Sequence, residues 1–550
     1  MKRRDFFKTA GLSALSVNGF SMRPFSNARI ARTLANCEAV EGRILILIQL
    51  KGGNDGINTL IPVAQYDTYA ELRPAIKIPE TGPERFIPLD NTLAAPDRIG
   101  LHPAMSSFKA LYDEGLLAIV QGVGYENMNG SHFKGTDLWL SGGDGTPEGF
   151  NIHSGWAGRA LQAMYPEVMG APIPDMLYPL GIQIGDANPS LGFHTDTEHQ
   201  NALNLYGQDP DGFYSLVQTI GGAPLQDIPD SEYGDEIAYI LGVERSVSQY
   251  SEYITAAFMA GSNSMVNYPQ NGFAYQLKTV ARMIKGGCKT KIYLCSMGGF
   301  DTHGRQIPPE GTVLTGGHAD LLRILSDGLK AFMDDLKALS LDDQVLACTF
   351  SEFGRCAREN GAAGTDHGTL APMFVVGKPV KAGVYGTNVD LTNLTDDQQV
   401  QGQQFDYRQV FGALLQDWLG GNQYVMEQAM FQYYSKIPLL QPDAVADPDC
   451  YLGLVAAWQE HTLPRGLMVW PNPVTSYAEA TFRSDKSWSG RLTLHTLTGR
   501  LVWGQTVQIQ QGQNMYYVPV ATLPAGTYLL RLEHSMTGQG YTAKVMKQKA

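Results

Sequence analysis

The chain has few cysteines, a low content of charged residues and no long apolar run. Six cysteines in 550 residues, none of them in a Cys-x-x-Cys pair, argue against a zinc ribbon or a thioredoxin-like motif. No run reaches the ~20 apolar residues of a membrane-spanning helix, so we expect a soluble mature chain with no transmembrane segment. Lysine and arginine number 41 against 54 aspartates and glutamates, a net charge of −13. A general nucleic-acid binder needs a basic face, so no nucleic-acid partner is expected.

The cysteines allow two interpretations. Cys295 and Cys348 lie inside apolar, strand-like runs, where cysteine usually serves as a small buried hydrophobe. A disulfide in an oxidising compartment is the alternative, because spacing alone does not decide between the two.

The N-terminus carries an export signature. Residues Met1–Lys8 read Met-Lys-Arg-Arg-Asp-Phe-Phe-Lys, and the pair Arg3 and Arg4 closely matches a twin-arginine export signal. The mildly apolar stretch Thr9–Met22 that follows is too short and too polar to span a membrane. We therefore predict a twin-arginine signal peptide over residues 1–40 and export by the twin-arginine machinery.

The C-terminal end changes to short alternating runs broken by Thr-Gly, Gln-Gly and Pro-Ala-Gly turns. This pattern predicts a small all-β sandwich domain over residues 466–550, after a linker over residues 441–465. The expected strands include Arg491–Leu497, Leu501–Val507, Tyr516–Val520 and Thr527–Glu533.

Several pieces of this segment resemble the C-terminal sorting domain of the type IX secretion system. The pieces are Pro471-Asn472-Pro473, Thr498-Gly499-Arg500, Leu523–Tyr528 and the basic end Lys544–Lys549. The resemblance implies the type IX machinery as a partner. It also implies passage through the periplasm, followed by an extracellular or outer-membrane surface location.

The middle of the chain, residues 41–440, alternates apolar runs with helical patterns. Short, nearly continuous apolar runs predict strands covered on both faces, as in a parallel sheet. The clearest helix is His318–Leu339, with one apolar stripe. The alternation predicts an α/β fold with a doubly wound, mostly parallel sheet. The predicted strands are Arg43–Leu50, Leu116–Val123, Lys291–Ser296, Gln344–Phe350 and Ala371–Val376.

Polar motifs stand at the ends of these predicted strands. Ligands of open α/β sheets bind beyond the carboxyl ends of the strands, and Asp, Glu and His side chains bind divalent metal ions. The motifs supply Asp55 after the first strand, Ser131 and His132 after the second, Asp301 and His303 after the third, Glu352 and Arg355 after the fourth, and Asp366 and His367 before the fifth.

Each motif also has an ordinary structural explanation. Asp55 beside a glycine suits a turn, and Ser131 suits a helix N-cap. His303 suits a surface or core histidine whose hydrogen bonds are made by structural partners, and Glu352 with Arg355 suits an ion pair. The joint placement of the motifs at one edge of the sheet favours a metal site.

A family resemblance rests on the same stretches. They are Leu50–Pro62, Leu101–Met105, Gly130–Phe133, Gly298–His303, Phe350–Arg355, Gly364–Thr369, Phe405–Val410 and Asp417–Gly420. From Arg43 to about Gly420 the chain resembles the domain-of-unknown-function 1501 family, within the alkaline phosphatase and sulfatase superfamily. The resemblance implies an alkaline-phosphatase-like fold with metal ions at the sheet edge and an alcohol nucleophile at a helix N-terminus.

The roles that the resemblance implies can be assigned residue by residue. Glu352 falls where many relatives have an Asp-His pair, and the next residue, Phe353, cannot bind metal. A second metal site is therefore expected to be weak, altered or absent. Asp55, Asp301, His303, Glu352 and His367 correspond to metal ligands, Ser131 corresponds to the nucleophile, and His132 beside it is a catalytic candidate.

These patterns predict an exported, metal-dependent hydrolase that acts on a small-molecule or glycan ester. We expect phosphate esters as substrates rather than sulfate esters. The segment Ser131–Gly135 reads Ser-His-Phe-Lys-Gly and therefore lacks the Cys/Ser-x-Pro-x-Arg signature of formylglycine sulfatases. The expected cofactor is one or two divalent ions, with zinc, manganese and calcium as candidates. The alternative is a non-catalytic surface protein that binds an anionic glycan or headgroup on a degenerate hydrolase scaffold.

Overall fold

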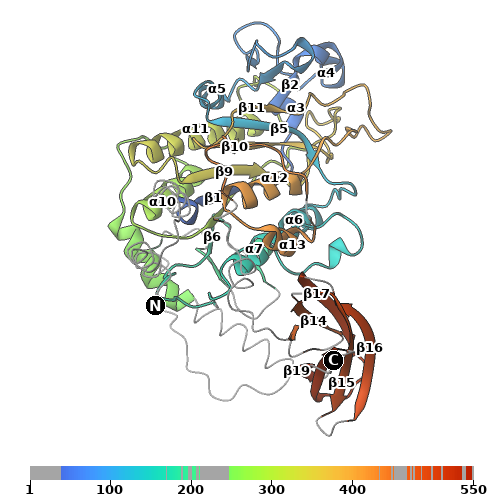
Figure 1. Cartoon of the computed structure of the whole chain (residues 1–550). Coiled ribbons are helices and arrows are strands. Elements are labelled where there is room, and N and C mark those ends of the chain that lie inside the picture. Colours follow the sequence, from blue (N-terminus) through green and yellow to red (C-terminus); the bar gives the residue numbers. More distant parts are fainter. Residues whose placement is uncertain are drawn as a thin grey trace, which may run out of the picture. The chain divides into compact units, whose positions relative to one another are not determined.

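The computed structural model of the chain contains two compact units, Met1–Gly453 and Leu454–Ala550 (Figure 1). It describes residues 39–168, 170–186, 190–195, 201–205, 210, 247–432, 434–447 and 450 of the first unit. In the second it describes residues 467–470, 474, 477–484, 486–496, 500–509, 512–534 and 540–547. The predicted signal peptide, apart from its last two residues, and most of the predicted linker lie outside these ranges.

A nine-stranded sheet forms the centre of the first unit. Its strands follow the order β11-β5-β10-β9-β1-β8-β6-β7, and β12 pairs with β5. Strand β1 pairs in parallel with β8 on one side and with β9 on the other. The strands are β1 (Ile44–Leu50), β5 (Leu117–Gly124), β6 (Gly181–Ile184), β7 (Ala202–Asn204), β8 (Ile292–Met297), β9 (Val345–Phe350), β10 (Ala371–Val376), β11 (Gly383–Tyr385) and β12 (Phe405–Asp406).

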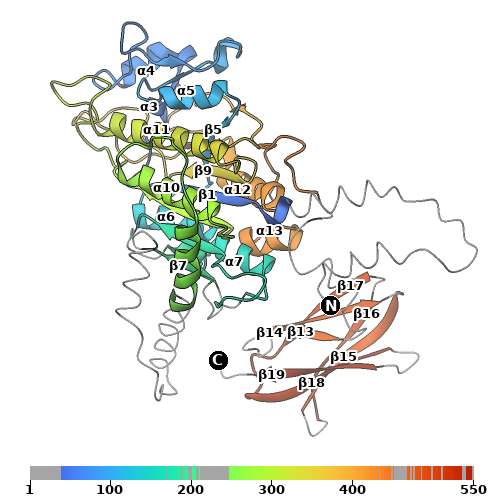
Figure 2. The same ribbon diagram turned by 90° about the vertical axis from the view of Figure 1, so that its left-hand side faces the viewer.

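Helices cover both faces of this sheet (Figures 1 and 2). Alternate residues of β1 contribute to opposite layers: Ile44, Ile46 and Ile48 belong to one apolar cluster, Leu45 and Leu47 to the other. This alternation is the period of two that a strand imposes, and it explains why the sequence of β1 is apolar throughout. The first cluster includes residues of α5 (Ser106–Asp113), α10 (Gly272–Lys285) and α11 (Gly317–Ala338); the second includes α6 (His132–Ser141), α7 (Trp156–Met164), α12 (Tyr407–Ala413) and α13 (Gln423–Met430).

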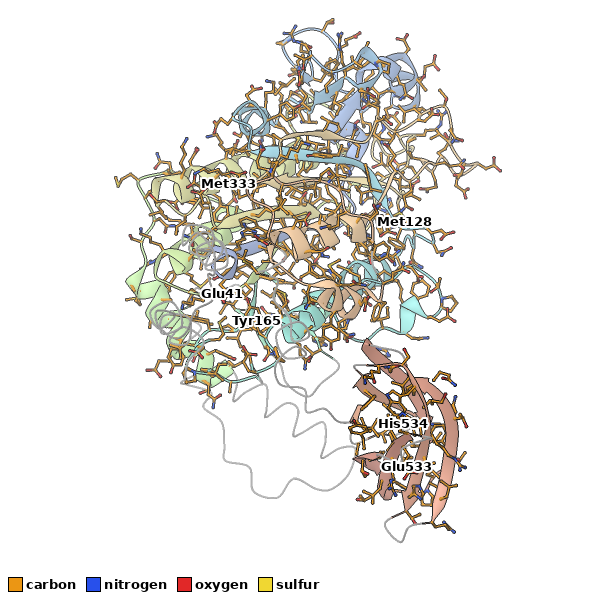
Figure 3. All side chains as sticks on the ribbon, viewed as in Figure 1. Glu41, Met128, Tyr165, Met333, Glu533 and His534 are labelled. Atoms are coloured by element: carbon orange, nitrogen blue, oxygen red, sulfur yellow. The ribbon has the colours of Figure 1, made fainter. Side chains whose placement is uncertain are left out.

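Side chains fill both layers, as Figure 3 shows for Met333 on α11 and Tyr165 directly after α7. The predicted strands are confirmed to within a residue at each end, and the predicted helix from His318 coincides with α11. The prediction of an α/β fold with a mostly parallel sheet is therefore confirmed.

Strand β10 departs from the parallel pattern. It runs antiparallel to both β5 and β9. The residues that precede β10 therefore lie at the same edge of the sheet as the residues that follow β1, β8 and β9. This orientation allows a motif placed before the fifth predicted strand to meet motifs placed after the others.

A small sheet flanks the region after β1. It consists of β2 (Leu60–Pro62), β4 (Ile99–Leu101) and β3 (Ile87–Pro88), in that order. Two short helices, α3 (Gly56–Thr59) and α4 (Tyr66–Leu72), lie in the same stretch of chain. Together they form a further apolar cluster that includes Ile61 and Tyr69.

The second unit is all-β. One sheet has the order β13-β14-β17 and the other β16-β15-β18-β19, and residues from both sheets share one apolar core, as in a sandwich. The predicted small β domain is confirmed. The strands are β13 (Met468–Trp470), β14 (Tyr477–Ser484), β15 (Trp488–Thr496), β16 (Leu501–Ile509), β17 (Gly512–Pro519), β18 (Gly526–His534) and β19 (Gly540–Lys547).

The cysteines behave in both of the ways that the sequence allows. Cys295 and Cys348 are fully buried and free, as expected of small hydrophobes in strands. Cys450 is disulfide-bonded. Among the residues that the structure describes, no helix is both long enough and apolar enough to cross a membrane.

Candidate metal centre

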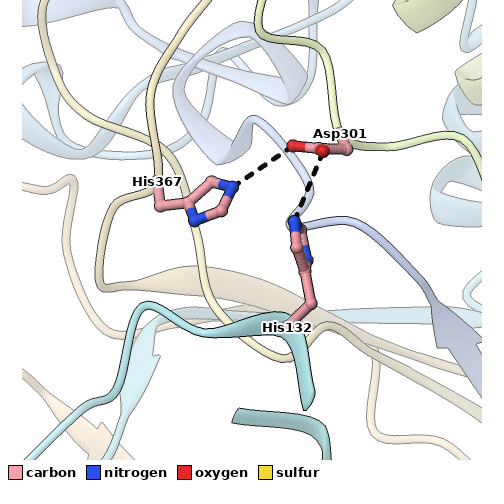
Figure 4. A group of neighbouring side chains, drawn as sticks. All are labelled: His132, Asp301 and His367. Atoms are coloured by element: carbon pink, nitrogen blue, oxygen red, sulfur yellow. Dashed lines mark hydrogen bonds and ion pairs between the residues drawn. The ribbon is translucent and has the colours of Figure 1, made fainter. Parts of the chain in front are cut away.

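Three histidines and one aspartate meet at the carboxyl edge of the central sheet. We call His132, Asp301, His303 and His367 the histidine cluster. Asp301 faces all three rings: its Oδ2 lies 3.3 Å from His132 Nε2, and its Oδ1 lies 3.3 Å from His367 Nε2 and 3.2 Å from His303 Nε2. Figure 4 shows the imidazoles of His132 and His367 directed at the Asp301 carboxylate. The ligand atoms of these three residues all lie within 4.8 Å of one another.

The cluster is assembled from three strand ends. His132 opens α6 after β5, Asp301 and His303 follow β8, and His367 precedes β10. Glycine allows these loops to approach closely: at Gly52, where φ is +119°, a Cβ atom would lie 2.3 Å from the backbone nitrogen of Asp301. Any other residue at position 52 would therefore displace the loop that carries Asp301.

Each imidazole is held through its Nδ1 atom by an acceptor. His132 Nδ1 lies 2.9 Å from Glu352 Oε1, and His303 Nδ1 lies 3.0 Å from Asp366 Oδ1. His367 Nδ1 lies 2.7 Å from the carbonyl oxygen of Gly130. Carbonyl and carboxylate oxygens accept hydrogen bonds, so each of these contacts suits a proton on Nδ1. A ring in that tautomer presents its Nε2 lone pair to the cluster.

The Nε2 atoms of His303 and His367 lie only 2.9 Å apart. Two nitrogen lone pairs at this distance repel each other unless a proton or a metal ion lies between them. Metal-binding histidines usually have this arrangement, in which Nδ1 donates to a carboxylate or carbonyl and Nε2 binds the ion. The donor set of the cluster therefore fits a divalent metal ion.

The charges around the cluster favour a cation as well. Three carboxylates contact the imidazoles of the cluster, those of Asp301, Glu352 and Asp366. One guanidinium, that of Arg355, donates from Nη2 to Asp301 Oδ1 at 2.7 Å. The carboxylates outnumber the guanidinium, and a divalent ion would reduce this excess of negative charge. Burial acts to raise the pKa of Asp301, but the hydrogen bond and charge of Arg355 outweigh it, so the pKa is lowered. The hydrogen bond from Asn360, and then that from His303, lowers the pKa of Asp366.

Glu352 acts on the cluster through His132. Its side chain is 2% exposed, and Oε1 accepts a hydrogen bond from the backbone N–H of Gly52 as well as from His132. We therefore assign Glu352 to positioning His132, although the sequence suggested a metal ligand. Conversely, His132 supplies a ligand atom, although the sequence suggested a catalytic role. The neighbouring Phe353 is buried and packs against the rings of His132 and His367, with centroids 5.0 and 4.6 Å away.

The structure does not bring Asp55 into the cluster. Its carboxylate is completely buried, and both oxygens accept hydrogen bonds from Arg73 Nη1, at 2.8 and 2.7 Å. Gln306 donates a further hydrogen bond to Oδ2. Burial acts to raise the pKa of Asp55, but the charge of Arg73 and these hydrogen bonds outweigh it. The predicted ligand role is corrected for this physical reason: the oxygens are already engaged in a buried ion pair.

Ser131 is the residue before α6, at the N-cap position, and its side chain makes no capping hydrogen bond. The residue is exposed, and within the described part of the chain its hydroxyl has no hydrogen-bond partner. Ser131 directly precedes His132 in the sequence, so its backbone adjoins the cluster.

Arg355 and His318, two further polar residues at this edge of the sheet, have structural partners. Arg355 is fully buried and donates to the carbonyl oxygens of Gly53, Thr365 and Phe300 as well as to Asp301, so its guanidinium has no free face for a substrate. His318 is also buried, 3.2 Å from Asn54 Oδ1, and does not join the cluster.

A cavity of about 500 Å³ lies beside the cluster. His132, Asp301 and Glu352 contribute to its lining, together with Lys51, which pairs with Asp186. The cluster is therefore accessible to a small molecule.

Substitution of Glu352 tests its positioning role. We expect Glu352→Gln to lower zinc affinity about 10- to 100-fold, because it weakens the contact that orients His132. Competition with a chromophoric chelator measures this affinity, with the exposed Glu252→Gln as the matched control. An unchanged affinity would contradict the positioning role, and a complete loss would favour direct ligation.

Substitution of Asp55 tests its assignment to the fold. Asp55→Asn leaves the buried Arg73 without its charge partner, and we expect a loss of about 3–5 kcal/mol of stability in urea unfolding at pH 7. Because the folded pKa of Asp55 lies below the unfolded value near 4, this contribution is complete above about pH 4. It is lost as the pH falls through the folded value, so the difference between variant and wild type should shrink in acid. The folded variant should keep its bound metal; a folded variant that has lost its metal would return Asp55 to the ligand set.

Two family descriptions match the sequence. Residues 247–407 match the family described as "protein of unknown function (DUF1501)". Residues 468–548 match the "secretion system C-terminal sorting domain". No curated protein matches the sequence of this chain.

Similar solved structures include a sulfatase, PsFucS1 from Pseudoalteromonas sp., at 11% identity over 94% of this chain and 90% of that chain, with a TM-score of 0.29. A protein in the alkaline phosphatase superfamily from Vibrio parahaemolyticus is 8% identical over 94% and 90%, with a TM-score of 0.26. A phosphonate monoester hydrolase from Silicibacter pomeroyi is 10% identical over 90% of both chains, with a TM-score of 0.23.

At these TM-scores the likenesses carry no argument about the site or the reaction. The two family matches confirm the resemblances that the sequence motifs indicated. Residues 247–407 match the DUF1501 family, within the longer stretch that the motifs indicated, and residues 468–548 match a secretion system C-terminal sorting domain.

Proposed function

We propose that this chain is an exported, metal-dependent hydrolase of phosphate or sulfate esters. One observation supports this function above the others: three imidazole Nε2 atoms and one carboxylate face one another beside an open cavity. Metal-dependent hydrolases use such an arrangement, in which protein ligands hold the ion and a cavity admits the ester.

His132, Asp301 and His367 would hold the ion, and His303 lies beside them, with its Nε2 2.9 Å from His367 Nε2. An imidazole-rich donor set suits zinc better than calcium, which prefers oxygen ligands. A bound divalent ion would neutralise the charge of the ester oxygens and lower the pKa of an oxygen nucleophile. The single cluster supports one ion rather than a pair.

Ser131 is the nucleophile in this proposal. Its hydroxyl is exposed, and it stands directly before the ligand His132 at the start of α6. Attack by Ser131 on phosphorus or sulfur would release the alcohol and form a covalent ester, which water would then cleave.

Metal binding and turnover test the proposal together. We expect chelator-stripped protein to bind one equivalent of zinc in calorimetry, and Asp301→Ala to abolish this binding, because it removes the carboxylate that faces all three rings. The exposed Asp443→Ala is the matched control and should bind zinc like the wild type. Turnover of a panel of aryl phosphate and aryl sulfate esters should appear only after zinc is restored.

Two outcomes would contradict the proposal. If the protein binds no divalent ion at the cluster, metal-dependent hydrolysis at this site is contradicted. Protein that binds zinc but hydrolyses no ester in the panel supports the alternative, a surface protein that binds an anionic ligand without cleaving it.

Replacement of the serine tests the nucleophile separately. We expect Ser131→Ala to lower turnover at least 100-fold while zinc binding stays unchanged, because the substitution removes the attacking oxygen but no ligand. Ser106→Ala, at the exposed start of α5, is the matched control. Unchanged turnover in Ser131→Ala would mean that water attacks the ester directly.

The C-terminal sorting domain indicates export and a surface or extracellular location. We propose in addition that a twin-arginine signal within residues 1–40 delivers the chain to the periplasm. Because that route exports folded proteins, it would allow the metal to be inserted before export.

A further inference from the structure

A second cavity, of about 380 Å³, adjoins the cavity beside the histidine cluster along α6. The two cavities share Asp137 and Leu191 in their lining, and Lys134, Phe150 and His153 help to line the second. A sulfate or phosphate group with a small alcohol would fill only part of the first cavity. The adjoining second cavity indicates a ligand that extends along α6, away from the cluster.

An exposed aromatic ring marks the entrance to the first cavity. Phe133 follows the ligand His132 in the chain, and it is 84% exposed while lining the cavity. A large aromatic side chain on a surface gains nothing from burial until a ligand covers it. The apolar face of a sugar ring is the usual partner of such a ring beside polar groups.

Polar side chains in the cavity suit hydroxyl groups. Gln49 is 4% exposed and lines the cavity; its amide nitrogen lies 3.4 Å from Thr136 Oγ1. Its amide oxygen has no hydrogen-bond partner within the described part of the chain. Buried amides that combine a donor and an acceptor recognise hydroxyl groups, which also donate and accept.

Each lysine that lines the two cavities has a carboxylate nearby. Lys51 pairs with Asp186, and Lys134 lies one turn of α6 from Asp137. A groove for a polyanion would present lysines without carboxylate neighbours. The acidic neighbours of these lysines therefore favour a ligand that is largely uncharged along its length. The charge of the ester group itself would face the histidine cluster.

From these features we propose that the alcohol part of the ester is an oligosaccharide that lies along α6, with one sugar stacked on Phe133. This inference rests on the proposed hydrolase function and adds its substrate class. Phe133 is a specificity residue in this arrangement and does not take part in the bond-breaking step.

Binding without turnover tests the inference first. A glycan array followed by calorimetry would measure binding of neutral, sulfated and phosphorylated oligosaccharides to chelator-treated protein. We expect at least one oligosaccharide to bind, and Phe133→Ala to weaken that binding about tenfold, equivalent to ~1.4 kcal/mol. Phe133→Trp should retain it, and Tyr275→Ala, on α10, is the control for an exposed aromatic residue elsewhere.

Kinetics then separates this inference from the function on which it rests. With an oligosaccharide ester, Phe133→Ala should raise KM about tenfold with kcat unchanged, while Tyr275→Ala should leave both unchanged. Turnover of small esters without any oligosaccharide binding would overturn the inference but leave the hydrolase. Oligosaccharide binding without turnover by zinc-loaded protein would overturn the hydrolase instead. Preferential binding of phospholipid vesicles would also overturn the inference.

Discussion

The site depends on holding three imidazole rings so that their Nε2 atoms face one carboxylate. Nitrogen lone pairs brought close together, as at the Nε2 atoms of His303 and His367 2.9 Å apart, repel each other unless a proton or a cation lies between them. In this chain the Nδ1 contacts to Glu352, Asp366 and the Gly130 carbonyl fix the rings from outside. A cation at the centre would relieve the repulsion, so the arrangement stabilises a bound ion and is in turn stabilised by it.

The topology of the sheet brings the ligands to one place. Parallel strands β1, β8 and β9 end at the same edge, and the antiparallel β10 begins there. Ligands separated by more than two hundred residues in sequence can therefore share one ion. Arg355 supports this edge from inside, since its guanidinium joins the loops after β1 and β8 to the residue Thr365 before β10.

Much of the central sheet and the location of the site could be predicted from the sequence. Apolar runs indicate buried strands, and the polar motifs after them indicate the edge of the sheet where a site would lie. The strands around Ile44–Leu50 and Ala371–Val376 and the helix α11 follow from hydrophobic pattern alone. The direction of β10 could not be predicted, since an apolar run reads the same in both directions. The role of Asp55 was misassigned because its partner Arg73 stands in a stretch without any motif.

The roles within the histidine cluster were also beyond the sequence. Histidine and glutamate are both metal-ligand types, and only the geometry, in which Glu352 contacts His132 Nδ1, distinguishes the roles proposed for His132 and Glu352. Phe353 was expected only to be unable to bind metal. Its buried ring in fact packs against the rings of His132 and His367.

The most direct test is anomalous diffraction at the zinc edge from crystals of the zinc-loaded protein. We expect one anomalous peak within bonding distance of His132 Nε2, His367 Nε2 and the Asp301 carboxylate, with His303 beside it. A peak bonded to Asp55, or no peak at the histidine cluster, would contradict it.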